Sequence, residues 1–312
     1  MLMPFNQDYR LFYEESHIKF ISPILLKAFS DDKFFDVVNN NILNPFSFLL
    51  VNELKNKNPN KEIINVCLNE IKSQKNESLI TDNILLVESL ETRGEKLELV
   101  KSTGEEEKRV KKILSDLKRK LPPEWTELIS IIKTITFVNI VGKESQLSHF
   151  SGSDTYRWGA IHMYKNINPF NIAECFTHEA SHHWLNLYEL FCPDEFIING
   201  WSDESFVSPW RKDKRPLMGI FHGLYVFSNV FYVLNYLENN SSHEDSERIQ
   251  RIGAQVKRGI EIMESHKSKL SEEARDLFNQ ITLRFSESYV KYKDKSNEHY
   301  KIILNEEALK NK

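Results

Sequence analysis

The sequence has little of what marks a secreted or disulfide-stabilised protein. Among its 312 residues there are 3 cysteines, an odd number without the spacing of a disulfide framework. The N-terminal residues MLMPFNQDYR contain no basic stretch followed by an apolar one, so we expect no signal peptide. Few, irregularly spaced cysteines fit a reducing compartment, and the composition therefore predicts a cytoplasmic protein.

Glycine, proline and an excess of charge of one sign are also scarce. With 10 Gly and 10 Pro, the composition argues against disorder and against a turn-rich all-β fold, and favours helices. The net charge of −4 gives no overall basic field, so nucleic acid is not an expected partner. We expect a single, predominantly α-helical α+β domain over residues 1–312, with residues 1–120 as a helical N-terminal layer and residues 121–312 as its core.

Only one long apolar run is present, at residues 217–237. Its length of about 20 residues would suit a membrane span. The run nevertheless contains His222, Ser228, Asn229 and Asn235, and no other segment resembles it. We therefore interpret it as a buried core helix and expect no membrane association.

The other elements are predicted from periodicity and from the positions of proline. Helices are expected at 17–30, at 61–73, in the second half of 92–120, and as two long amphipathic helices across 243–307. The β-branched segment 127–142 predicts a strand or the end of a buried helix, and Ala160–Tyr164 (AIHMY) predicts a second strand. These two segments together predict a small β-sheet beside the helix that carries the motif described next.

An HExxH motif occupies residues 178–182 within a predicted helix. Residues four apart share one helix face, so His178 and His182 can bind one metal ion with the carboxylate of Glu179 beside them. The competing interpretation is a pair of hydrogen-bonded core histidines. It is disfavoured because burying two imidazoles and a carboxylate together without a metal is costly. His183 lies about 100° further round the helix and is expected at its surface or behind the ligands.

The boundaries of this helix are predicted from capping residues. Asn171 is a good N-cap, and Glu174, three residues later, resembles the partner in a capping box. The helix is expected to end at Cys192, because Pro193 cannot continue it.

A metal site with open positions needs a third protein ligand. No glycine and histidine follow the motif at the metzincin spacing, so that class is excluded. Glu204 has the spacing of the third ligand in a thermolysin-like zinc peptidase. His222 is the alternative, because it is the strongly polar residue in the first half of the apolar run. An ordinary core histidine is the competing interpretation of His222.

Basic residues precede the apolar run, at Arg211, Lys212, Lys214 and Arg215. Pro216 can open the helix that follows, and the free amides of a helix N-terminus also favour anions. The segment therefore predicts a pocket for a carboxylate or phosphate of a small molecule. The alternative is a solvated basic loop.

The HExxH motif and the block SPWRKDKRPLMGIFHGLYVF at residues 208–227 together resemble the HExxH-type peptide modification family. These proteins accompany ribosomally made, post-translationally modified peptides and are regarded as α-ketoglutarate-dependent peptide β-hydroxylases. The resemblance covers about residues 170–235. It implies an oxygenase that uses Fe(II), α-ketoglutarate and O2 to hydroxylate a side-chain Cβ of a precursor peptide.

The resemblance also implies roles for individual residues. Fe(II) would be held by His178, His182 and His222. Because the more familiar iron oxygenases use two histidines and one carboxylate, Glu204 or Glu179 stays open as the carboxylate ligand. Otherwise Glu179 would orient water, a ligand or the substrate.

The same block would bind the cosubstrate. The distal carboxylate of α-ketoglutarate would pair with Arg211 or Arg215, because a planar guanidinium suits a bidentate carboxylate. Ser208 and Trp210 are assigned to the same cosubstrate site. Two other functions stay open: a zinc metallopeptidase of the gluzincin-like HExxH type, and a non-catalytic peptide-binding or structural protein.

Overall fold

The computed structural model describes Leu50 and residues 53–54, 57–73, 97–140, 151–153, 159–164, 168–191, 195–202, 205–238 and 243–310. The predicted helix 17–30, Cys192 and Glu204 lie outside these residues. Two compact units are present. One contains residues 117–128 and those from 172 onward, and the other contains the described residues up to 116 together with 129–171. The single-domain organisation stays a prediction.

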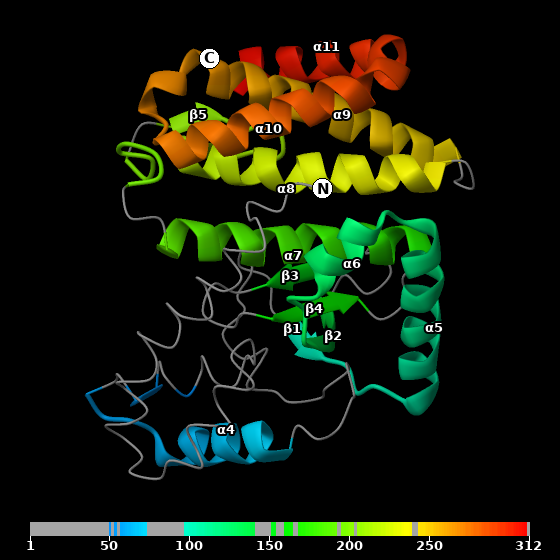
Figure 1. The fold of residues 1–312 in the computed structure, drawn as a ribbon, viewed down its shortest axis with the longest axis vertical. Coiled ribbons are helices and arrows are strands. Elements are labelled where there is room, and N and C mark those ends of the chain that lie inside the picture. The colour runs from blue at the N-terminus through cyan, green and yellow to red at the C-terminus, as the bar shows by residue number, and fades with distance from the viewer. Residues whose placement is uncertain are drawn as a thin grey trace. The chain divides into compact units, whose positions relative to one another are not determined.

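The second of these units contains the small sheet (Figure 1). Its elements are α4 (Lys61–Ser73), β1 (Leu97–Leu99), most of α5 (Gly104–Lys120), β2 (Thr134–Ile140), β3 (Ser151–Ser153) and β4 (Ala160–Tyr164). The strand order is β1-β2-β4-β3; β2 and β4 are parallel, and both edge pairs are antiparallel. The predicted helix 61–73 and strand 160–164 are confirmed, as is a charged helix in the second half of 92–120.

The segment 127–142 is divided between two elements. Its first residues end α6 (Pro123–Ile129), and β2 follows after a short turn. Ile135 and Phe137 of β2 pair in register with Ile161 and Met163 of β4, and all four are buried. Thr134, Thr136 and Val138 on the opposite face of β2 are buried as well, and β-branched and aromatic residues suit such a packed strand. The position of this sheet beside the HExxH helix stays a prediction.

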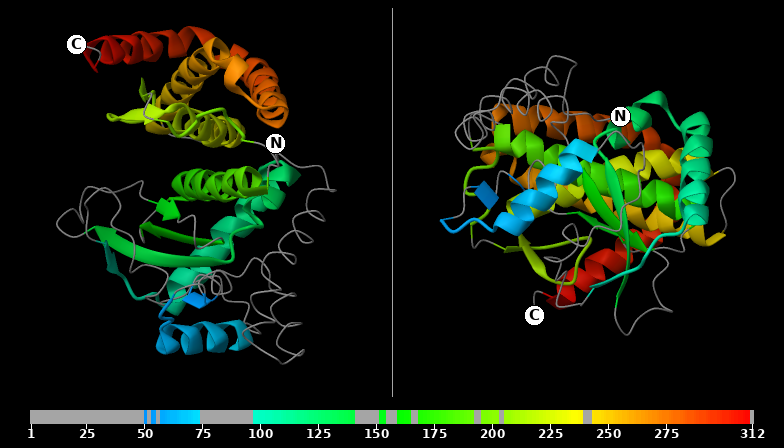
Figure 2. Two further views of the ribbon diagram at one scale, coloured as in Figure 1. Left: turned by 90° about the vertical axis from the view of Figure 1, so that its left-hand side faces the viewer. Right: turned by 90° about the horizontal axis from the view of Figure 1, so that it is seen from below.

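Where the structure describes it, the other unit is helical apart from one hairpin and an isolated bridge between Ile197 and Leu270. Besides α6, its elements are α7 (Pro169–Phe191), β5 (Ser205–Val207), β6 (Lys214–Pro216), α8 (Leu217–Leu237), α9 (His243–Ser265), α10 (Glu272–Tyr289) and α11 (Lys293–Lys310), with short 3-10 turns at Lys267–Lys269 and Val290–Tyr292. Helix α8 lies between α7 and the layer formed by α9, α10 and α11 (Figures 1 and 2). With the small mixed sheet, these helices make the protein predominantly α-helical in an α+β fold, as predicted.

Helix α8 is the buried apolar run. Among the described residues it is the one helix long and apolar enough to cross a membrane, and 72% of its most apolar stretch is buried inside the protein. Residues on all sides of it are buried, from Leu217 to Leu234. An all-round apolar helix between two layers is what a core helix requires. The interpretation of residues 217–237 as a core helix is confirmed.

The prediction of two long helices across 243–307 is wrong, because three are present. Helix α9 ends at Ser265, and α10 begins after Ser271, whose hydroxyl accepts a hydrogen bond from the Ala274 amide at 3.1 Å. A serine N-cap followed by Glu272 and Glu273 is a standard helix start. The sequence does not predict this break between α9 and α10, because the amphipathic pattern continues on both sides of it.

An ion pair joins α7 to α9. Glu174 is buried, and Arg248 Nη2 lies 2.5 Å from its Oε1. Replacing Arg248 with methionine leaves the buried carboxylate without its cation, so we expect the free energy of unfolding to fall by about 2 kcal/mol, allowing for the partial exposure of Arg248. Lys108→Met is the control, since its ion pair with Glu105 is exposed and contributes at most about 0.5 kcal/mol. Urea unfolding of both variants measures the difference.

Candidate functional site

Helix α7 begins earlier than its sequence suggests. The side chain of Asn168 accepts a hydrogen bond from the Asn171 amide at 2.8 Å, and Pro169 occupies the first helical position. The predicted N-cap at Asn171 is therefore wrong, because Asn168 caps the helix and Asn171 is buried in its first turn. Glu174 forms the ion pair with Arg248 instead of capping the helix.

Buried hydrogen bonds fix the rotation of α7 about its axis. Trp125 Nε1 of α6 donates to Thr177 Oγ1 at 2.9 Å, and Trp184 Nε1 donates to the Leu128 carbonyl at 2.8 Å. From the α8 side, Asn229 Nδ2 donates to Ser181 Oγ at 3.2 Å. Buried polar groups are satisfied in this way only at one rotation of the helix. The histidines of the motif are thereby held on a defined face.

His178 and His182 form a close pair. Their Nε2 atoms are 3.1 Å apart, and their ring centroids are 4.8 Å apart at 71°. With metal–nitrogen bonds of about 2.1 Å, two nitrogens on one ion lie about 3.0 Å apart at a right angle and about 3.4 Å apart at the tetrahedral angle. The pair therefore fits a shared ion. It also fits a hydrogen bond between one protonated and one unprotonated ring nitrogen.

His222 of α8 adjoins this pair. Its ring centroid is 5.0 Å from that of His182, at 62°. His222 Nε2 is buried and has no hydrogen-bond partner among the described residues. A buried nitrogen without a partner is costly unless something binds it. The three histidines predicted from the sequence therefore lie together, two on α7 and one on α8.

The environment favours the neutral form of His182 and His222. Burial lowers the pKa of His182 well below its ordinary value, and the charges of His178, His222, His183 and Arg211 lower it further. Burial, followed by the charge of His178, lowers the pKa of His222 to about 4, although a hydrogen bond with the backbone of His182 opposes the shift. A neutral imidazole has the lone pair that metal binding requires.

Two carboxylates are the other candidate ligands. Glu179 is buried beside His178, while Glu204 lies outside the described residues. Across the described part of the chain, no three His, Cys, Asp or Glu side chains are arranged as a complete metal site. The histidine pair is formed, and the third ligand stays a prediction. His183 is fully buried rather than at the surface, and Cys175 is a buried core residue.

The basic segment is a hairpin rather than a simple loop. Strands β5 and β6 pair antiparallel, with Phe206 opposite Arg215, and residues 208–213 connect them. Ser208 is buried, and its hydroxyl accepts a hydrogen bond from the Trp210 amide at 3.3 Å. A serine in this position stabilises a tight turn. The hairpin leads directly into α8, whose N-cap is Pro216.

Trp210 is wedged between two helices. A Cβ at Gly223 of α8 would lie 2.6 Å from its Cε3, and a Cβ at Gly259 of α9 would lie 2.5 Å from its Cη2. The indole stacks on Phe227, with centroids 5.6 Å apart at 4°, and Phe227 packs its ring edge-to-face with His178. The Trp210 indole N–H is buried without a partner among the described residues.

Arg211 and Arg215 share one counterion. Asp213 Oδ1 lies 3.0 Å from Arg211 Nε, and its Oδ2 lies 2.8 Å from Arg215 Nε. Burial alone would raise the pKa of Asp213, but hydrogen bonding and the charges of both arginines lower it overall. The contact made by Arg211 uses Nε and leaves the terminal nitrogens of the guanidinium for another anion. The charge of Arg211 also contributes to the lowered pKa of His182. The stack of Trp210 on Phe227, which packs against His178, places the basic segment next to the histidines.

Two side chains that no sequence pattern singles out form hydrogen bonds with the backbone of this segment. Gln255 Nε2 of α9 donates to the Pro209 carbonyl at 2.8 Å, and Lys310 Nζ of α11 donates to the Arg211 carbonyl at 3.0 Å. Both partners are far away in the chain. The two glycines that flank Trp210 were the available signal, because a glycine within a helix is costly unless close packing requires it.

The paired histidines make a direct prediction about metal binding. We expect His178→Ala and His182→Ala each to weaken Co(II) binding by roughly a hundredfold, since each ligand contributes about 3 kcal/mol to a multidentate site. His222→Ala should behave alike if it is the third ligand. Equilibrium dialysis and the visible spectrum of bound Co(II) measure the affinity. His299→Ala on α11 is the control and should bind as wild type does; equal affinity in all four variants would refute the site.

Comparison with protein-family models and with curated proteins found no match to this chain. Two local features bear on function. One is the histidine pair of α7 with His222 beside it. The other is the basic hairpin, and the charge of its Arg211 lowers the pKa of His182.

Proposed function

We propose that this protein is an Fe(II)- and α-ketoglutarate-dependent dioxygenase that hydroxylates a side-chain Cβ of a ribosomally synthesised precursor peptide. One observation carries the proposal: Trp210, the residue before Arg211, stacks on Phe227, whose ring packs edge-to-face with His178, so the basic hairpin lies beside a pair of histidines with the spacing of metal ligands. A peptidase has no evident use for that arrangement. An enzyme with an anionic, metal-bound cosubstrate needs it.

The histidines would hold the metal. His178 and His182 have the Nε2 separation that one ion requires, and His222 supplies a buried nitrogen in need of a partner. Glu204 or Glu179 is the alternative third ligand. When bound, Fe(II) with α-ketoglutarate and O2 supplies the oxidising chemistry for C–H hydroxylation, and α-ketoglutarate is converted to succinate and CO2.

The hairpin would bind the cosubstrate. Arg211 offers the terminal nitrogens of its guanidinium to the distal carboxylate, and Arg215 is its alternative. Ser208 holds the turn, and the buried indole N–H of Trp210 is a further donor. Phe227 packs on His178 and is itself covered by Trp210, so these rings would keep water from that side of His178.

The peptide substrate and the cytoplasmic location are proposed on different grounds. The substrate class follows from the resemblance of the HExxH motif and the block at residues 208–227 to peptide β-hydroxylases. The location follows from the low cysteine content, and Cys67 and Cys175 are both buried. In this reading Glu179 orients water or substrate near His178 rather than acting as a base.

Anaerobic reconstitution tests the cosubstrate assignment. Adding α-ketoglutarate to the Fe(II) protein should produce a weak visible charge-transfer band. Arg211→Gln should raise the dissociation constant for α-ketoglutarate roughly 10- to 100-fold, because a charge-assisted contact is lost. Arg215→Gln tests the alternative. Lys212→Gln is the matched control, since it removes the same charge from an exposed position of the same hairpin. Wild-type affinity in both arginine variants would overturn the assignment.

Substitution of Glu179 by glutamine separates this proposal from a zinc peptidase. In a peptidase Glu179 would activate a zinc-bound water, so Glu179→Gln would abolish peptide hydrolysis by the zinc form. In a hydroxylase we expect Glu179→Gln to retain Fe(II) binding and the α-ketoglutarate band. Hydrolysis of peptides by the wild-type zinc form, lost in this variant, together with the absence of any band, would establish the peptidase.

A further inference from the structure

One face of α9 lies along the hairpin that carries Arg211. Gln255 donates to the Pro209 carbonyl at 2.8 Å, Gly259 contacts the indole of Trp210, and His266 packs edge-to-face on Phe206 with ring centroids 4.7 Å apart. The α9 positions 255 and 259 lie one turn apart on one side of the helix, and His266 directly follows its last residue. These three residues contact the hairpin at Pro209, Trp210 and Phe206.

The backbone of Gly259 lies so close to the Trp210 indole that a side chain would not fit between them. A Cβ there would lie 2.5 Å from Trp210 Cη2 and 3.1 Å from its Cζ2, while a Cβ at Gly223 would meet the other edge of the same ring. The indole is rigid and stacks on Phe227, so it cannot yield as a flexible side chain would. The position of Trp210 is set by the backbones of α8 and α9 together, and Arg211 is the next residue in the chain.

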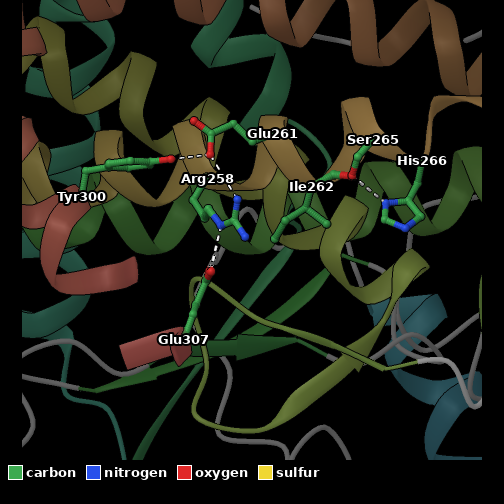
Figure 3. A network of polar contacts seen from close by, with 7 residues as sticks. All are labelled: Arg258, Glu261, Ile262, Ser265, His266, Tyr300 and Glu307. Atoms are coloured by element: carbon green, nitrogen blue, oxygen red, sulfur yellow. Dashed lines mark hydrogen bonds and ion pairs between the residues drawn. The ribbon is translucent and has the colours of Figure 1, made fainter. Parts of the chain in front are cut away.

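Helix α11 also supports the hairpin, at the backbone of Arg211. Arg258 of α9 binds Glu307 of α11 through Nε, at 2.9 and 3.1 Å, and binds Glu261 through Nη1 at 3.2 Å (Figure 3). The Tyr300 hydroxyl of α11 also donates to Glu261. Glu307 is buried in this network. One turn further along α11, Lys310 donates to the Arg211 carbonyl at 3.0 Å.

We propose that Gln255 and Gly259 of α9 and Lys310 of α11 are positioning residues for Arg211. Together they fix the backbone of residues 209–211 at successive points, and Asp213 binds Nε of the Arg211 guanidinium, so the cation is positioned before any anion binds. This inference rests on the proposed role of Arg211 in binding the cosubstrate. Holding the group in place in advance removes an ordering cost that the ligand would otherwise meet on binding.

The test is a glycine substitution with a size-complementing rescue. Gly259→Ala should push the indole aside, speed amide hydrogen exchange across residues 205–216 and weaken α-ketoglutarate binding to the Co(II)-loaded protein by about tenfold or more, as measured by calorimetry. Adding Trp210→Phe removes the ring atoms that clash, so the double variant should recover exchange protection, and the two effects should not add.

Gly253→Ala is the matched control on the same helix. Its Cβ would meet Phe231 Cε2 at 2.9 Å and the Tyr289 ring at 3.1 Å, away from the hairpin. It should lower thermal stability without altering exchange across residues 205–216 or α-ketoglutarate affinity. If Gly259→Ala does not fold, Lys310→Met carries the same test with a smaller effect, because it removes the contact to the Arg211 carbonyl and leaves the core intact.

The outcomes separate this inference from the function it rests on. The positioning role is supported if Gly259→Ala shows faster amide exchange and weaker α-ketoglutarate binding, and if the double variant recovers exchange protection. Wild-type exchange and affinity in a folded Gly259→Ala protein overturn it. If exchange accelerates as expected but the wild-type protein binds no α-ketoglutarate, the positioning role stands and the proposed cosubstrate is wrong.

Discussion

The indole of Trp210 is the constraint on which the candidate site depends. It lies where α8 and α9 each carry a glycine, and neither helix backbone could approach it so closely with a side chain at that position. Phe227 covers one face of the ring and in turn touches His178 on α7. A single side chain from the hairpin thus connects the helix of the motif, the buried apolar helix and the C-terminal helices. Close packing of this kind transmits small shifts, because cores have little free volume to absorb them.

The histidine pair could be predicted from the sequence because its geometry is local. An i, i+4 spacing brings His178 and His182 together in any α-helix, whatever surrounds it. His222 was identifiable because a strongly polar residue stood out in an apolar run, but its closeness to His182 depends on how α7 packs on α8. The Asn229–Ser181 hydrogen bond is part of that packing and has no counterpart in sequence periodicity.

Other features of the site could not be predicted from the sequence, and the structure shows why. Asn171 has the right residue type for an N-cap, but Asn168 followed by Pro169 is the stronger start, and the helix uses it. The pairing of Asp213 with both arginines depends on the turn of the hairpin, which the run of basic residues does not predict. The contacts of Gln255 and Lys310 join residues that no local pattern relates.

The hydrogen bond from Lys310 to Arg211 spans 99 residues of chain. During synthesis, the histidine pair can form as soon as α7 is folded, whereas the hairpin has its full support only after α9, α10 and α11 have left the ribosome. Contacts of such long sequence separation form late, because a large loop must close before they can contribute. A nascent chain therefore has its histidine pair in place long before the hairpin is fully supported, so assembly of the candidate site is complete only once α11 has been translated.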